Sequence, residues 1–212
     1  MIESSILRIY LVTDNPSSYT GDFVEAVEQA IDGGVTIVQY RDTQSDDRTI
    51  FSRVLRLQKM LRAKKIPLII NNRADIAIAV NAEGVHIGQT DMPPEAVRNI
   101  IGDKMILGLS VTNENDISTA KKGVVDYVGI GPVFDAVNTK NDAAPPLGLE
   151  RFKAIRDRLL DIPAVAIGGI NLQNAEDIIR HGADGLAIVS AFSKSDTPKI
   201  AAQIFVSFIS NK

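Results

Sequence analysis

Several short apolar segments of this sequence end in polar or charged residues whose types suit the handling of a phosphorylated substrate. An arginine and a lysine can neutralise phosphate oxygens, and amide and carboxylate oxygens are ligands that Mg²⁺ accepts. No Ser-His-Asp arrangement or pair of glutamates is suggested, so the set favours stabilisation of a departing polyphosphate over acid–base hydrolysis. In chain order these candidates are Gln39, Arg41, Asn71, Asn72, Asp91, Ser110 and Lys140.

A second kind of site is indicated near the C-terminus, where two apolar segments end in small residues. One runs into Gly168 and Gly169, and the other into Val189 and Ser190. Small residues let backbone N–H groups approach an anion, and the loops after the last two strands of a parallel barrel commonly bind phosphate. We therefore expect a phosphate group at this pair of loops.

The charged and amide candidates also have purely structural interpretations. Strand alternation points Gln39 and Arg41 to the same inner side, where Arg41 needs either an anionic ligand or a salt bridge to a core carboxylate. Asn72 and Asp91 both precede predicted helices and are suited to capping them. Lys140 fits a solvated surface lysine as well as a phosphate ligand. The two interpretations of each residue predict different contacts.

Strand-like and helical patterns alternate along the chain and predict the elements that position these residues. Strands are expected at residues 7–13, 35–40, 67–70, 84–87, 105–109, 124–130, 164–167 and 185–189. Helices are expected at residues 20–31, 46–65, 74–80, 93–101, from 113 or 115 to 122, 149–160, 174–181 and 198–209, with a long polar loop at 135–148. Eight such units predict an α/β fold, a single (β/α)8 TIM barrel over residues 1–212, with the candidates at the strand ends. An open doubly wound sheet is the alternative.

The composition favours a soluble domain that acts on a small molecule. The 212 residues are 45% hydrophobic and 23% charged with a net charge of −3, and basic and acidic residues are interspersed. This pattern argues against nucleic-acid and membrane-surface partners. Because cysteine, a signal peptide and a membrane-spanning apolar run are all absent, we expect a cytoplasmic protein. The sequence leaves open whether the chain forms a homo-oligomer. Of the two histidines, His86 is expected in the core and His181 at a helix end.

Taken together, eight segments resemble the thiamine phosphate synthase family, in the same order and over nearly the whole chain. They are residues 10–14, 33–41, 68–72, 84–91, 107–110, 126–134, 139–140 and 167–170. The resemblance implies a TIM-barrel transferase that joins hydroxymethylpyrimidine diphosphate to a thiazole phosphate and releases pyrophosphate. In that family the diphosphate, held by Mg²⁺, leaves first, and the thiazole nitrogen captures the pyrimidine-methyl cation.

The resemblance also implies roles for individual residues. Arg41, Ser110 and Lys140 would be catalytic, and Asn72 and Asp91 would bind Mg²⁺. The pyrimidine diphosphate would lie against Gln39, Tyr40, Arg41, Asp42, Thr43, Asn71, Ser110 and Lys140. The thiazole phosphate would lie against Val137, Asn138, Thr139, Gly169, Val189 and Ser190.

Two positions depart from the family's pattern. Thr43 stands where a lysine usually binds the diphosphate, and Asn72 stands where an aspartate usually binds Mg²⁺. These missing charges keep open a non-catalytic barrel that binds a thiamine precursor. A thiazole tautomerase of the same superfamily is the other alternative. That enzyme carries a catalytic histidine two residues after the serine of the fifth strand, where this chain has Thr112.

Overall fold

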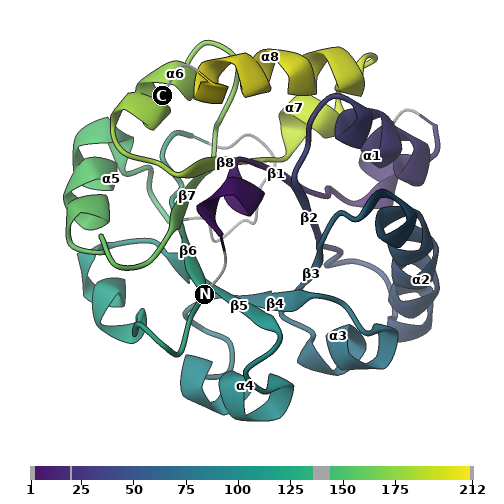
Figure 1. Ribbon diagram of the computed structural model, residues 1–212, viewed down its shortest axis with the longest axis horizontal. Helices are drawn as coiled ribbons and strands as arrows, with labels where there is room; N and C mark the ends of the chain where they lie inside the picture. The colour runs from purple at the N-terminus through teal and green to yellow at the C-terminus, as the bar shows by residue number, and fades with distance from the viewer. Residues whose placement is uncertain (1–2, 20, 136–143, 211–212) are drawn as a thin grey trace.

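The chain folds into a closed barrel of eight parallel strands, which confirms the predicted TIM barrel (Figure 1). The structure, a computed structural model, describes residues 3–19, 21–135 and 144–210. Each strand pairs with the next, and the last strand closes the barrel against the first. The strands are β1 (Ile9–Val12), β2 (Ile37–Tyr40), β3 (Leu68–Asn71), β4 (Gly84–Ile87), β5 (Ile106–Val111), β6 (Tyr127–Ile130), β7 (Ala164–Ile167) and β8 (Gly185–Ile188).

Helices surround the barrel, and aspartate side chains cap the first turns of two of them. Asp22 accepts the backbone N–H groups of Val24 and Glu25, and Asp46 accepts that of Thr49, so these carboxylates satisfy donors that a helix start leaves unpaired. Among the described residues, no helix has both the length and the apolar character that a bilayer span requires. The helices are α1 (Phe23–Asp32), α2 (Asp47–Lys64), α3 (Ala74–Val80), α4 (Pro94–Ile101), α5 (Gly148–Asp157), α6 (Ala175–Arg180), α7 (Ser190–Ser193) and α8 (Pro198–Ser210), with the 3-10 turns η1 (Ser4–Leu7), η2 (Pro16–Ser18) and η3 (Glu114–Thr119).

The predicted helix that ends at residue 122 is wrong. Only the 3-10 turn η3 forms between β5 and β6, because short polar side chains there bind the backbone in place of helical partners. Asp116 accepts the N–H of Thr112 at 2.7 Å, and the Thr119 hydroxyl donates to the carbonyl of Asp116 at 2.6 Å. Strand β5 also runs two residues further than expected, which places Ser110 inside the strand rather than after it.

The core has two layers, one on each side of the barrel wall. The larger layer fills the space between strands and helices and includes Leu57, Leu61 and Phe152. The smaller layer fills the barrel interior and includes Leu7, Tyr10 and Tyr127. In Figure 1 the purple turn η1 lies across the centre of the barrel, where Leu7 caps the inner layer. The amino end of the barrel is therefore closed by the chain itself.

Four residues repeat one hydrogen-bonding arrangement at the amino ends of the strands. Each directly precedes an even-numbered strand, donates its backbone N–H to the first or second residue of the preceding strand, and accepts that residue's N–H with a side-chain oxygen. We call them the clamp residues: Thr36, Glu83, Asp126 and Asp184, paired with Ile9, Leu68, Leu107 and Ala164 respectively. The arrangement satisfies strand-start donors that would otherwise be unpaired inside the fold.

Candidate functional site

The first two strands are joined at their carboxyl ends by Thr13. Its hydroxyl accepts the backbone N–H of Arg41 at 2.9 Å and donates to the carbonyl of Arg41 at 3.2 Å. Arg41 is half-buried, and its guanidinium has no ion pair or hydrogen bond among the described residues. The internal salt bridge that was the alternative for Arg41 is therefore not formed with any described carboxylate, and the cation stays available to an anionic ligand.

The side chains that flank Arg41 are either buried in contacts within the protein or exposed to solvent. Asp42 has a fully buried side chain that accepts hydrogen bonds from the Tyr40 hydroxyl at 3.0 Å and from Arg53 at 2.9 Å. Burial and the neighbouring Asp42 raise the pKa of Tyr40 well above its usual range. Thr43 is exposed. Within residues 39–43, Tyr40 and Asp42 thus shape the loop, and Arg41 is the charged group with unused donors.

The ends of β3 and β4 lie side by side and carry the predicted metal ligands. Asn71 is paired in register with His86, and Asn72 follows with an exposed side chain and a left-handed φ of 64°. The Asp91 carboxylate accepts the N–H of Gly88 at 2.7 Å, which leaves one of its oxygens without a hydrogen bond among the described residues.

The capping interpretations of these two residues are wrong. Neither α3 nor α4 has a side-chain cap, and the N-cap positions are Arg73 and Pro93. The amide of Asn72 and the carboxylate of Asp91 are therefore not used to start the helices that follow them. Both groups remain at the carboxyl edge of the barrel, where a ligand can use them.

Ser110 is held on two sides inside β5. Its hydroxyl is hydrogen-bonded to Nε2 of His86 at 2.9 Å, and its carbonyl accepts from Nε2 of Gln89 at 2.7 Å. Gln89 is in turn bound by the Thr119 hydroxyl at 3.1 Å. The half-buried serine is thus fixed in position before any ligand binds.

Sequence reasoning missed several of the groups that position the site. His86 is buried as expected, yet it contacts Ser110 and Tyr127, and burial lowers its pKa to about 4. Tyr10 and Tyr127 lie in the barrel interior, and burial raises the pKa of both hydroxyls. Strand parity could have found them, because Tyr10 is two residues before Val12 on the inner face and such buried hydroxyls need partners.

The two glycines after β7 allow close packing of neighbouring loops. Gly168 and Gly169 have left-handed φ values of 95° and 67°, and a Cβ on Gly169 would lie 2.6 Å from Cβ of Phe134. Ser190 is exposed at the start of α7, and Val189 packs against the inner layer of the core. No hydrogen bond of the described residues uses the backbone N–H of Gly169 or Ser190, so both donors are open to an anion.

Four predicted site residues lie outside the residues that the structure describes. They are Val137, Asn138, Thr139 and Lys140, within the loop expected at 135–148. The predictions for them therefore stay predictions. The same holds for the choice between a ligand and a surface role for Lys140.

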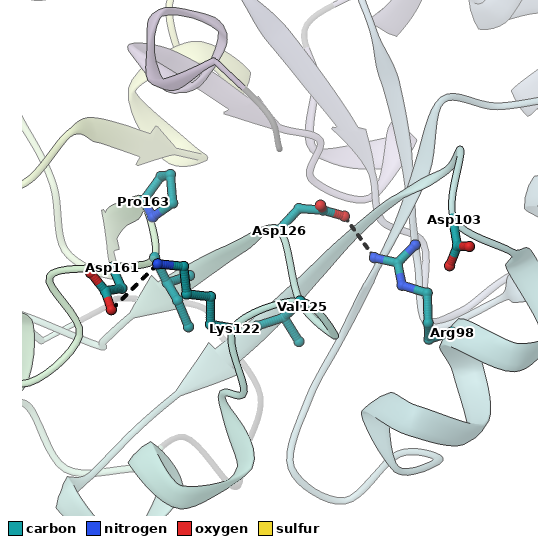
Figure 2. A pocket seen from close by; sticks show the side chains of 9 residues that line it. Arg98, Asp103, Lys122, Val125, Asp126, Asp161 and Pro163 are labelled. Carbon is teal, nitrogen blue, oxygen red and sulfur yellow. Dashed lines mark hydrogen bonds and ion pairs between the residues drawn. The ribbon is translucent and has the colours of Figure 1, made fainter.

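A hollow of about 230 Å³ at the opposite end of the barrel offers little to a ligand (Figure 2). Arg98 in its wall is paired with Asp126 at 2.7 Å and also donates to backbone carbonyls, and Lys122 is paired with Asp161. These four charges are thus already paired within the protein, and the other charged group in the wall is the carboxylate of Asp103, which would repel an anion. None of the predicted site residues lines it.

Comparison with known proteins links this barrel to one family. The chain matches the Thiamine monophosphate synthase family over residues 9–192. It is 45% identical to the thiamine-phosphate synthase of Chloroflexus aurantiacus over 92% of this chain and 89% of the relative, and 42% identical to that of Clostridium novyi over 89% and 92%. A solved thiamine phosphate pyrophosphorylase from Pyrococcus furiosus superposes with a TM-score of 0.87 at 32% identity, over 98% of both chains.

Proposed function

Because this chain belongs to the thiamine monophosphate synthase family and is a transferase that makes thiamine phosphate, we propose that its residues divide the two substrates between two parts of the barrel mouth. The ends of β2 to β5 bind hydroxymethylpyrimidine diphosphate. The loops after β7 and β8 bind the thiazole phosphate. The reaction breaks the bond between the pyrimidine methylene carbon and the diphosphate oxygen and forms a bond from that carbon to the thiazole nitrogen.

One observation carries the assignment of the diphosphate. Arg41 is half-buried at a strand end, and its guanidinium has no carboxylate partner among the described residues. A cation without a partner at a strand end is available to an anionic ligand, and a planar guanidinium suits two phosphate oxygens. As the diphosphate departs it gains negative charge, so Arg41 binds it more strongly in the transition state than in the ground state.

The donors at the ends of β3 and β4 fit a magnesium ion. Asp91 offers a carboxylate oxygen and Asn72 an exposed amide, which are hard oxygen ligands of the kind that Mg²⁺ accepts. Among the described residues, no group of three or more acidic, histidine or cysteine side chains is placed to enclose a metal. Mg²⁺ beside phosphates is typically held by one or two carboxylates, with water and phosphate as the other ligands. When bound, the ion neutralises part of the diphosphate charge.

We assign the thiazole phosphate to the loops after β7 and β8. The open N–H groups of Gly169 and Ser190 are donors, and the Ser190 hydroxyl is exposed beside them. Both loops follow strands on the side of the barrel away from β3 and β4 (Figure 1). This separation supports a nucleophile that approaches the methylene carbon from the side opposite to the departing group.

A turnover assay tests the proposal. The purified protein, given Mg²⁺ and both substrates, is expected to form thiamine phosphate and pyrophosphate in equal amounts, and both products should disappear when EDTA removes the metal. Ligand binding without product would favour the non-catalytic barrel instead. Conversion of the thiazole phosphate alone into an isomer would favour a tautomerase. We do not expect this isomerisation, because Thr112 stands where the tautomerase has its catalytic histidine, and its hydroxyl and N–H are used to bind Asp116.

A further inference from the structure

A continuous chain of hydrogen bonds crosses the barrel interior and joins two predicted substrate ligands. The amide of Gln39 donates to the Tyr10 hydroxyl at 2.8 Å, and that hydroxyl meets the Tyr127 hydroxyl at 2.6 Å. Tyr127 is hydrogen-bonded to Nδ1 of His86 at 2.9 Å, and Nε2 of His86 reaches Oγ of Ser110 at 2.9 Å. Five side chains from five different strands are therefore connected.

Two glycines make the room for this chain. A Cβ on Gly108 would lie 2.2 Å from the Tyr127 ring and 2.5 Å from Nδ1 of His86, and a Cβ on Gly129 would lie 3.3 Å from the His86 ring. Gly108 is in register with both His86 and Tyr127. Any larger residue at that position would separate the imidazole from the phenol. The strand sequences therefore build the contact between His86 and Tyr127.

The hydrogens of the chain can be placed by counting donors. Because Gln39 donates to Tyr10, the Tyr10 hydrogen has one acceptor among the described residues, the oxygen of Tyr127. The Tyr127 hydrogen then goes to Nδ1 of His86, which must carry no hydrogen of its own. An imidazolium would leave one phenol hydrogen without an acceptor, at the cost of an unmade buried hydrogen bond. With Gln39 donating to Tyr10, the ring is therefore neutral and carries its hydrogen on Nε2.

We propose that this ordering fixes Ser110 as a hydrogen-bond donor to the substrate, with His86, Tyr127 and Tyr10 as positioning residues. Oγ of Ser110 accepts from Nε2 of His86, so the serine hydrogen is free to point at a ligand. The inference rests on the proposed binding of the pyrimidine at Ser110. A pyrimidine ring nitrogen is an acceptor and matches such a donor. If the Gln39 amide were rotated by half a turn, its oxygen would face Tyr10 and every hydrogen bond in the chain would reverse. Ser110 would then donate to His86 and could only accept from the substrate. The direction of the bond at Gln39 therefore sets the role of Ser110.

Nitrogen-15 NMR of the histidine side chains tests the ordering without any turnover. The protein has two histidines, and a His181→Gln variant assigns the signals. At pH 7 we expect Nε2 of His86 to be protonated and Nδ1 to be bare. A hydrogen on Nδ1, with or without one on Nε2, would overturn the proposal whether or not the enzyme is active.

A double-mutant cycle tests the action through Ser110. His86→Leu is expected to lower kcat/KM by about tenfold or more, and His86→Gln, which keeps an amide donor, should restore part of it. In a Ser110→Ala background, His86→Leu should cost little, because residues that act as a unit are not additive. Equal losses in both backgrounds would show a merely structural histidine. An inactive wild-type protein would count against the proposed function, whereas an active one with additive losses counts against this inference alone.

Tyr127→Phe extends the test along the chain and has a matched control. It removes the donor to Nδ1 of His86, so it should weaken the donor at Ser110 and lower kcat/KM. Tyr19→Phe removes another largely buried hydroxyl, which accepts the N–H of Asp14 and lies outside the chain. We expect the control to keep kcat/KM. Equal effects of the two substitutions would contradict the proposal.

Discussion

The Thr13 hydroxyl and the backbone of Arg41 form a reciprocal pair of hydrogen bonds at 2.9 and 3.2 Å, which fixes the position of Arg41 before substrate arrives. Thr13→Val keeps the shape of the fully buried side chain but removes both bonds. We expect unfolding free energy to fall by about 1–3 kcal/mol and kcat/KM to fall as the diphosphate ligand loosens. Urea unfolding and steady-state kinetics measure the two effects, and unchanged kinetics would separate Thr13 from catalysis.

Arg41→Ala should act mainly on kcat. If Arg41 stabilises the departing diphosphate, its loss removes an interaction that strengthens in the transition state, and kcat should fall by about 100-fold. Arg48→Ala is a matched control, because Arg48 is exposed in α2 and has no ion pair among the described residues. A rise in KM with kcat unchanged would instead mean that Arg41 binds ground state and transition state equally.

Restoring the two missing charges should tighten the binding of magnesium pyrophosphate. Thr43→Lys adds a cation for the diphosphate and Asn72→Asp adds an anion for the metal, and together they are expected to lower Kd by about tenfold. Both positions are exposed, so little else should change. Titration calorimetry of the single and double variants measures the change. Weaker binding in the double variant would mean that this chain has rearranged the site around the neutral residues.

His86 should make folding stability depend on pH below neutrality. Burial lowers its pKa to about 4 from 6.5, and its ring contacts the uncharged Tyr127 and Ser110. Well above pH 6.5 the ring is neutral in both the folded and the unfolded protein, so its full contribution to stability is present. As pH falls from 6.5 towards 4 the unfolded chain binds a proton that the folded protein does not, and about 3 kcal/mol of stability is lost. Urea midpoints across this range should show the slope in the wild type and lose it in His86→Gln.

The clamp residues should carry stability without affecting catalysis. Asp184 accepts the N–H of Ala164 at 2.8 Å and pairs with the largely buried Arg156 at 2.9 Å, so Asp184→Asn should lower unfolding free energy by about 1–3 kcal/mol. Asp161→Asn is the matched control, since its pair with Lys122 is exposed and 3.5 Å long. Because Asp184 lies at the end of the barrel away from the site, kcat should be unchanged in both variants.

The barrel was predictable because its signals are local and repeated. Buried strands alternate with amphipathic helices, of which α1 and α2 begin at the caps Asp22 and Asp46, and this alternation needs no knowledge of distant contacts. The helix expected after β5 failed because Asp116 and Thr119 bind the backbone locally, a competition that helical periodicity does not register.

The site was predictable as a set of strand ends, whereas its supports were not. Residue type marked Arg41 and Asp91, but His86 could not be assigned a contact from sequence, because its partners Tyr127 and Ser110 are set by strand register across the barrel. The buried carboxylate of Asp42 likewise has its ion-pair partner, Arg53, in the following helix α2. Residues that act by positioning other side chains can be identified only from the three-dimensional structure.

The fourfold arrangement of clamp residues implies that the barrel is a ring of four cooperative units. Each side-chain clamp joins an odd strand to the even strand that follows it, so β1–β2, β3–β4, β5–β6 and β7–β8 are tied twice at their amino ends. At the same amino ends, the seams between these units are joined by backbone bonds, such as that from the N–H of Val38 to the carbonyl of Pro67, and none of the four clamp side chains crosses them. Sub-global opening should therefore separate strand pairs rather than single strands, and native-state hydrogen exchange should show the two members of each pair exchanging with the same free energy.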